Sequence, residues 1–130
     1  MKTTYFWFPG MLCTLFLVGC PAAESEGVCA AEDRAEPILS GDELAGEDEL
    51  IVFAFDSLDP APPDLGENEW VVSLASLSGS ALEGCTLEAR PWMPDHGHGS
   101  TDVTATNQGY GSYSIAGLEF VMPGYWTVSL

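Results

Sequence analysis

Short runs of alternating apolar and polar residues fill the chain from residue 50 onward. These runs are rich in β-branched and aromatic residues, and Gly, Pro, Asn and Ser separate them. They lack the 3.6-residue period of an amphipathic helix, whereas alternation with a period of two is typical of strands that bury one face. The pattern therefore predicts an antiparallel all-β domain over residues 50–130.

Six segments of this domain are expected to form strands, namely 50–56, 70–74, 86–90, 102–106, 113–120 and 126–130. The first segment is nearly all apolar, which suits a strand covered on both faces. Turn residues at 107–109 and 122–124 are expected to reverse the chain. Six or seven short strands in about 80 residues favour a small immunoglobulin-like β-sandwich, and a compact barrel is the alternative.

The first nineteen residues have the pattern of a secretory leader. An early charge at Lys2 precedes an apolar stretch that ends at Gly19, directly before Cys20. The string Leu-Val-Gly-Cys at 17–20 resembles the bacterial lipobox, which implies cleavage before Cys20 and lipidation of its thiol. A membrane-spanning helix is the alternative, but Pro9 interrupts the apolar stretch, which is shorter than the roughly 20 residues that a span requires.

The lipobox resemblance implies a lipid-anchored protein of the cell envelope that faces the periplasm or the exterior. Several acyl chains together anchor a protein stably to a membrane. Pro21 stands where an aspartate would suggest retention at the inner membrane, so the outer membrane is the default, although the sequence leaves the choice open.

Residues 20–49 are expected to form a flexible acidic tether. The segment is dominated by Ala, Glu, Asp, Gly and Ser, with scattered large apolar residues such as Ile38 and Leu39. Such a composition buries too little apolar surface to offset the entropy of ordering. A flexible coil of about 30 residues has an end-to-end distance of around 30 Å, so the domain would stand off the membrane.

Charge and cysteine content restrict the partners and the covalent structure. The chain has 20 acids against three Lys and Arg residues, for a net charge of −17, so nucleic acid is not an expected partner.

Once the leader is cleaved and Cys20 is lipidated, Cys29 and Cys85 remain in an oxidising compartment. A disulfide between them is the expected pairing, with free or intermolecular thiols as the alternative.

A histidine- and methionine-bearing motif is the best candidate for chemistry. Residues 93–99 read Met-Pro-Asp-His-Gly-His-Gly, and a second Met-Pro-Gly begins at Met122. Imidazole suits copper, zinc and nickel, while the softer thioether tilts the choice toward Cu(I). The candidate ligands are therefore Met93, His96, His98 and Met122, and Asp95 could be an oxygen ligand or orient an imidazole ring. The alternative is an exposed loop with solvated histidines and methionines packed in the core.

These residues also carry a resemblance to a known family. The Met93 motif, the Gly-Ser-Tyr at 111–113 and the Gly-Tyr-Trp at 124–126 resemble the YtkA-like domain, a relative of the FixH proteins, over about the last 80 residues. The resemblance implies an exported or membrane-tethered β-sandwich. FixH relatives are linked to oxidase assembly and to handling of copper or other cations, which suggests Met93, His98 and Met122 as ligands. His96 stands where the family pattern has a second methionine, which leaves Cu(II) and zinc open beside Cu(I).

The sequence bears on three classes of function: metal binding, protein interaction and catalysis. The preferred hypothesis is a membrane-tethered, non-enzymatic module that binds copper, with zinc as the alternative, and exchanges it with a donor or acceptor protein. A structural or protein-interaction lipoprotein without metal is the second. An enzyme is not expected, because Ser100, His98 and Asp95 lie too close in sequence for a catalytic triad.

Overall fold

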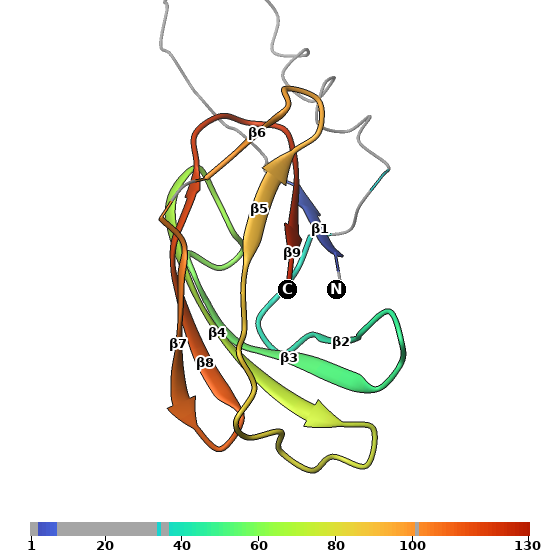
Figure 1. Ribbon diagram of the computed structural model, residues 1–130. Helices are drawn as coiled ribbons and strands as arrows, with labels where there is room; N and C mark the ends of the chain where they lie inside the picture. The colour runs from blue at the N-terminus through green and yellow to red at the C-terminus, as the bar shows by residue number, and fades with distance from the viewer. Residues whose placement is uncertain (1–2, 8–33, 35–36, 101) are drawn as a thin grey trace, which may run out of the picture.

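Two antiparallel sheets form the protein, as the computed structural model shows over residues 3–7, 34, 37–100 and 102–130 (Figure 1). One sheet has the order β1-β9-β5-β6 and the other the order β2-β3-β4-β8-β7. The strands are β1 Thr3–Trp7, β2 Glu43–Ala45, β3 Ile51–Asp59, β4 Gly66–Ser76, β5 Arg90–Met93, β6 His98–Gly99, β7 Thr104–Gly109, β8 Ser112–Phe120 and β9 Tyr125–Ser129. The predicted all-β sandwich is confirmed.

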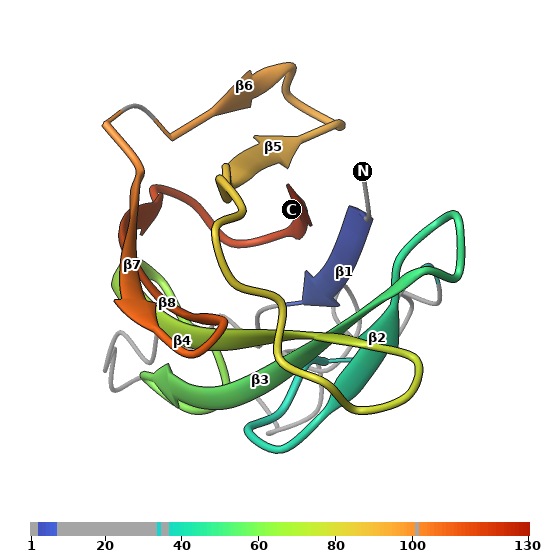
Figure 2. The same ribbon diagram turned by 60° about the horizontal axis from the view of Figure 1, so that its bottom comes forward.

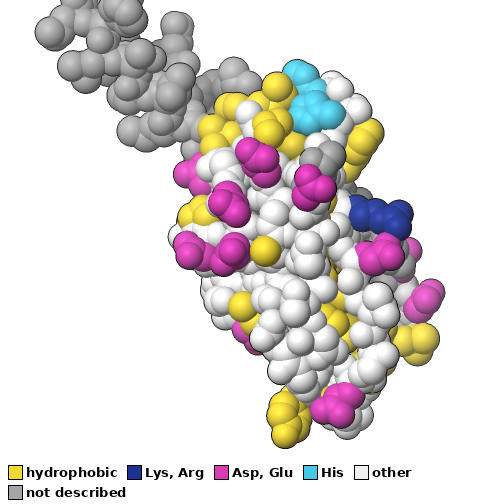
Figure 3. Space-filling view, turned by 60° about the vertical axis from the view of Figure 1, so that its left-hand side comes forward, with side chains coloured by type: hydrophobic (Ala, Val, Ile, Leu, Met, Phe, Trp, Pro, Cys, Tyr) yellow, Lys and Arg dark blue, Asp and Glu magenta, His cyan; other side chains and the backbone are white. Residues whose placement is uncertain are grey.

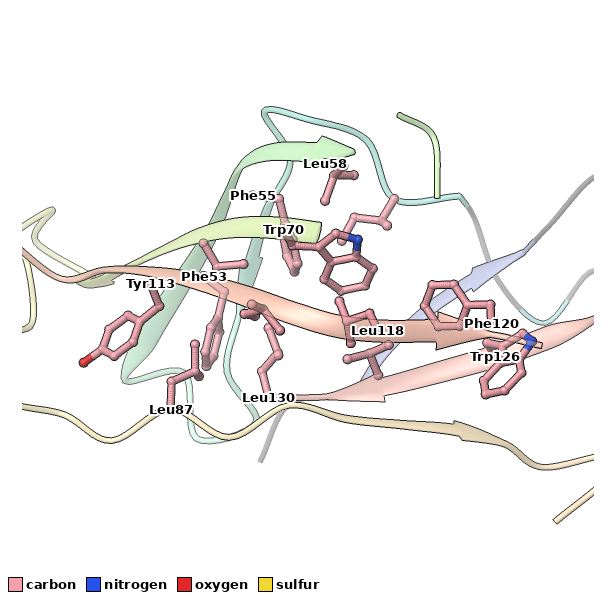
Figure 4. Packing of buried hydrophobic residues seen from close by; sticks show 14 of the residues in the cluster. Phe53, Phe55, Leu58, Trp70, Leu87, Tyr113, Leu118, Phe120, Trp126 and Leu130 are labelled. Carbon is pink, nitrogen blue, oxygen red and sulfur yellow. The ribbon is translucent and has the colours of Figure 1, made fainter. Parts of the chain in front are cut away.

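The core lies between the two sheets. Strand β4 alternates in burial along its length, and Trp70, Val72 and Leu74 point inward. β8 contributes Tyr113 and Ile115, both almost completely buried. Figure 4 shows how these side chains interleave with those of β9, from Tyr113 at one end of the core to Trp126 at the other. Each strand with period-two alternation therefore buries one face.

The segment after residue 36 belongs to the sandwich rather than to the predicted tether. Ile38 is 3% exposed and packs in the core, and β2 pairs with β3. The described domain thus begins before residue 50. Few apolar residues are enough to order this acidic segment. The edge of β3 pairs with its backbone, and the core accepts the Ile38 side chain.

Two predicted local features differ from the structure. Residues 86–89 are not a strand, although Leu87 is buried, and the strand begins at Arg90. The reversal predicted at 107–109 lies instead at Tyr110 and Gly111, whose φ values of 53° and 77° are left-handed. Residues 107–109 continue β7 with a bulge. Positive φ at both central residues is the pattern of a type I′ hairpin turn, which local composition did not reveal.

Strand β1 lies within the predicted leader. It pairs with β9 over five registered positions, from Thr3 opposite Ser129 to Trp7 opposite Tyr125. Figure 2 shows β1 beside the C-terminal strand, along the edge of the smaller sheet. Cleavage before Cys20 would remove this strand and leave the β9 edge open. Within the described residues, no helix is long and apolar enough to cross a membrane.

Candidate functional site

The candidate ligands at 93–98 lie on a tight hairpin at one end of the sandwich. Met93 ends β5 and stands opposite His98 of β6. The amides of His96 and Gly97 both donate to the Met93 carbonyl, at 3.2 and 2.8 Å. Gly97 has a φ of 69°, a conformation that favours glycine. The turn of the hairpin therefore lies between Met93, which carries a thioether, and His98, which carries an imidazole.

Close approach of β6 to β5 depends on Gly99. A Cβ atom at this position would overlap the backbone carbonyl of Pro91. Glycine thus allows the short strand to pair, and the pairing places Met93 and His98 on one face, since opposite residues of an antiparallel ladder project together. The two glycines that the motif contains have separate roles, one in the turn and one in the strand contact.

His98 and Met93 are both directed toward the end of the core. The His98 ring packs edge-on against Trp126, with centroids 5.4 Å apart and planes at 72°. Met93 is 1% exposed. His96 is exposed on the loop, and its ring centroid lies 6.1 Å from that of His98. Two imidazoles that share one ion have centroids about 5 to 6.5 Å apart when each metal–nitrogen bond is about 2 Å, so the spacing permits a shared ion.

The segment with Met122 closes over the same end. Met122 is partly buried and packs against the core, and its carbonyl accepts a 3.0 Å hydrogen bond from Nε1 of Trp126. A Cβ atom on Gly124 would overlap the methyl group of Met93. The 122–124 turn therefore lies directly on Met93. The structure brings all four predicted ligands to one end, where Figure 3 shows the two histidines beside hydrophobic side chains.

Asp95 contacts Arg34 through both of its carboxylate oxygens. Nη1 donates to Oδ1 at 2.9 Å and Nη2 donates to Oδ2 at 2.7 Å. The hydrogen bond from Arg34 lowers the pKa of Asp95 below its ordinary value of 3.8; the charges of Arg34 and His96 act in the same direction, against partial desolvation. The predicted orienting role of Asp95 stays a prediction. Arg34 was not recognised from the sequence, because nothing local links two residues 61 positions apart.

Of the cysteines with a predicted covalent role, Cys85 alone lies in the described part of the chain. Cys85 is a free, exposed thiol in the described part of the chain; it adjoins Tyr113, whose hydroxyl donates to the Cys85 carbonyl, far from Trp126 (Figure 4). Cys20 and Cys29 fall outside the described residues, so the lipidation and disulfide predictions remain predictions. The Ser100 hydroxyl, which a catalytic triad would need as its nucleophile, donates a hydrogen bond to the Glu119 carbonyl.

The fold and this end of it define a class: a β-sandwich domain with two imidazoles and one thioether on a hairpin and a second thioether on the neighbouring turn. The family model of the YtkA-like domain matches residues 52–130, so the chain belongs to the YtkA-like family. The family suggested by the motifs is thereby confirmed. Comparison with curated proteins finds no match, and comparison with solved structures finds none either.

Proposed function

We propose that this protein binds copper at the hairpin end of its sandwich and hands the ion to, or receives it from, another protein outside the cytoplasm. The observation that carries the proposal is the pairing of Met93 with His98 across β5 and β6, with His96 and the Met122 turn beside them. Thioether and imidazole together favour copper over harder ions. The lipid on Cys20 would hold the module at the membrane.

The burial of Met93 argues for a site that opens only slightly. Its thioether is almost fully covered, and the 122–124 turn contacts its methyl group. A bound ion would therefore be held first by the two accessible imidazoles, and the thioethers would complete the set as the turn shifts. Such a stepwise site suits transfer of an ion rather than permanent storage.

A titration of the full chain with Cu(I), Cu(II) and Zn(II) under chelator competition tests the proposal. Thiols also bind Cu(I), so the four cysteines are replaced by serine. One tight copper site is expected, and the His96→Ala, His98→Ala double variant is expected to lose it. Equal binding by the parent and the double variant would remove the site.

A protein-interaction role is the second candidate, and a cavity at the other end of the sandwich favours it. The cavity has a volume of about 410 Å³. Its lining includes the apolar residues Phe53 and Leu130 and the acidic residues Glu47, Asp48 and Glu88. A lining of apolar and acidic residues would accept an apolar, basic segment of a partner. This role predicts indifference to metals and chelators, so the same titration separates the two candidates.

A further inference from the structure

Arg34 connects the two segments that carry the candidate ligands. Its guanidinium holds Asp95 of the β5–β6 hairpin by two hydrogen bonds and stands 4.1 Å from the centre of the Tyr125 ring. Tyr125 begins β9 directly after the 122–124 turn. A planar fork that binds a carboxylate with two bonds and stacks on an aromatic ring is specific to arginine.

This contact decides which donor atoms the hairpin offers. Asp95 is the only carboxylate between residues 93 and 99, and both of its oxygens accept from Arg34. Over the described ranges, no three side chains drawn from His, Cys, Asp and Glu form a metal-binding group, although Asp95, His96 and His98 span only four positions. Both oxygens of the Asp95 carboxylate instead face the Arg34 guanidinium.

The available donors set the preference for a metal. Two imidazoles with thioethers form a soft to borderline set that suits copper, whereas two imidazoles with a carboxylate suit zinc. We propose that Arg34 determines metal specificity by withholding the Asp95 carboxylate, so that the end of the sandwich selects copper over zinc. This inference rests on the proposed copper-binding function and adds a residue to it that lies about sixty positions upstream of the motif.

Four versions of the cysteine-free full chain test the proposal: the parent, Arg34→Gln, Arg34→Gln with Asp95→Asn, and Arg90→Gln. The last is a matched control, because Arg90 also pairs with a surface carboxylate, Glu88, at 2.6 Å. Dissociation constants for Zn(II) and Cu(I) are measured by chelator competition. Arg34→Gln is expected to raise the zinc-to-copper affinity ratio about 10-fold. This is the lower end of the change in metal affinity that follows mutation of residues hydrogen-bonded to groups at a metal site. The added Asp95→Asn change is expected to abolish the rise, and Arg90→Gln to leave the ratio as in the parent.

The results separate this inference from the function beneath it. If the parent binds copper through His96 and His98 but Arg34→Gln leaves the ratio unchanged, the specificity role is wrong and the copper site stands. A rise that survives Asp95→Asn would show that the carboxylate is not its source, which also overturns the role. If the parent binds neither metal, both proposals fail. Arg34→Lys, which keeps the charge and loses the fork, is expected to give an intermediate ratio, and circular dichroism verifies that each variant is folded.

Discussion

The imidazole of His98 packs edge-on against the indole of Trp126, with ring centroids 5.4 Å apart. An ion at His98 would therefore lie close to one buried fluorophore, while Trp70 sits deeper in the core and Trp92 is exposed. We expect Cu(II) to quench the emission of Trp126 on binding. Fluorescence titration measures this, and the Trp126→Phe variant should lose most of the change. Full quenching in the His98→Ala variant would place the ion elsewhere.

The contact between Gly124 and Met93 yields a second prediction. Gly124 has a φ of 142° and no room for a Cβ beside the Met93 methyl group, so Gly124→Ala should lower the free energy of unfolding by about 1–3 kcal/mol. It should also weaken Cu(I) binding, because Met93 must move. Gly79→Ala is the matched control: its φ of 82° is also left-handed, but nothing lies within 4 Å. Denaturant unfolding and copper titration should show that both variants are strained and that only Gly124→Ala loses affinity.

The lowered pKa of Asp95 predicts how its contact with Arg34 responds to acid. A carboxyl whose pKa is lowered in the folded state stabilises that state above its ordinary value of 3.8, and the stabilisation is lost as the pH falls through the lowered value. The contact should therefore persist at pH 3.8 and break only as the pH falls through the lowered pKa of Asp95. A carboxyl-carbon NMR titration of Asp95 measures the midpoint. Arg34→Gln should return the midpoint toward 3.8, and a midpoint above 3.8 in the parent would contradict the contact.

The hydroxyl of Tyr113 predicts a stability effect far from the hairpin. It donates to the Cys85 carbonyl at 2.6 Å and accepts from Nδ2 of Asn107 at 3.1 Å, and the side chain is 1% exposed. Tyr113→Phe leaves both partners without this bond and should destabilise the fold by about 1–2 kcal/mol. Tyr110→Phe, at a side chain that is 86% exposed, should change the unfolding midpoint little. Equal midpoints for the two variants would argue against the buried hydroxyl pair.

Pairing of β1 with β9 predicts a difference between the full chain and the chain that begins at residue 20. β9 lies between β1 and β5, so removing residues 1–19 leaves one of its edges without a partner. Amides of Tyr125–Ser129 that face β1 should exchange faster with solvent in the shorter chain, while those that face β5 stay protected. Hydrogen-exchange mass spectrometry or NMR measures both. Unchanged protection along all of β9 would mean that β1 does not cover it.

Much of the fold was predictable because period-two alternation directly reflects burial on one face. The segments around Trp70, Ile115 and Val128 were placed in strands on that ground, and the structure buries all three. Alternation failed at 86–89, where Leu87 is buried without a hydrogen-bonded ladder. Burial and strand pairing are different properties, and side-chain pattern reports only the first.

The sequence by itself determined the all-β class, the family and the identity of the four candidate ligands, because alternation, turn glycines and a rare cluster of His and Met are properties of neighbouring residues. The tertiary structure alone decided that Met93 faces His98 across a ladder, that the Met122 turn lies on Met93, and that Trp126 borders His98. It also revealed Arg34 on Asp95 and the place of Ile38 in the core. These relations join residues far apart in the chain, and only the packing of two sheets fixes which of the many conceivable long-range contacts form.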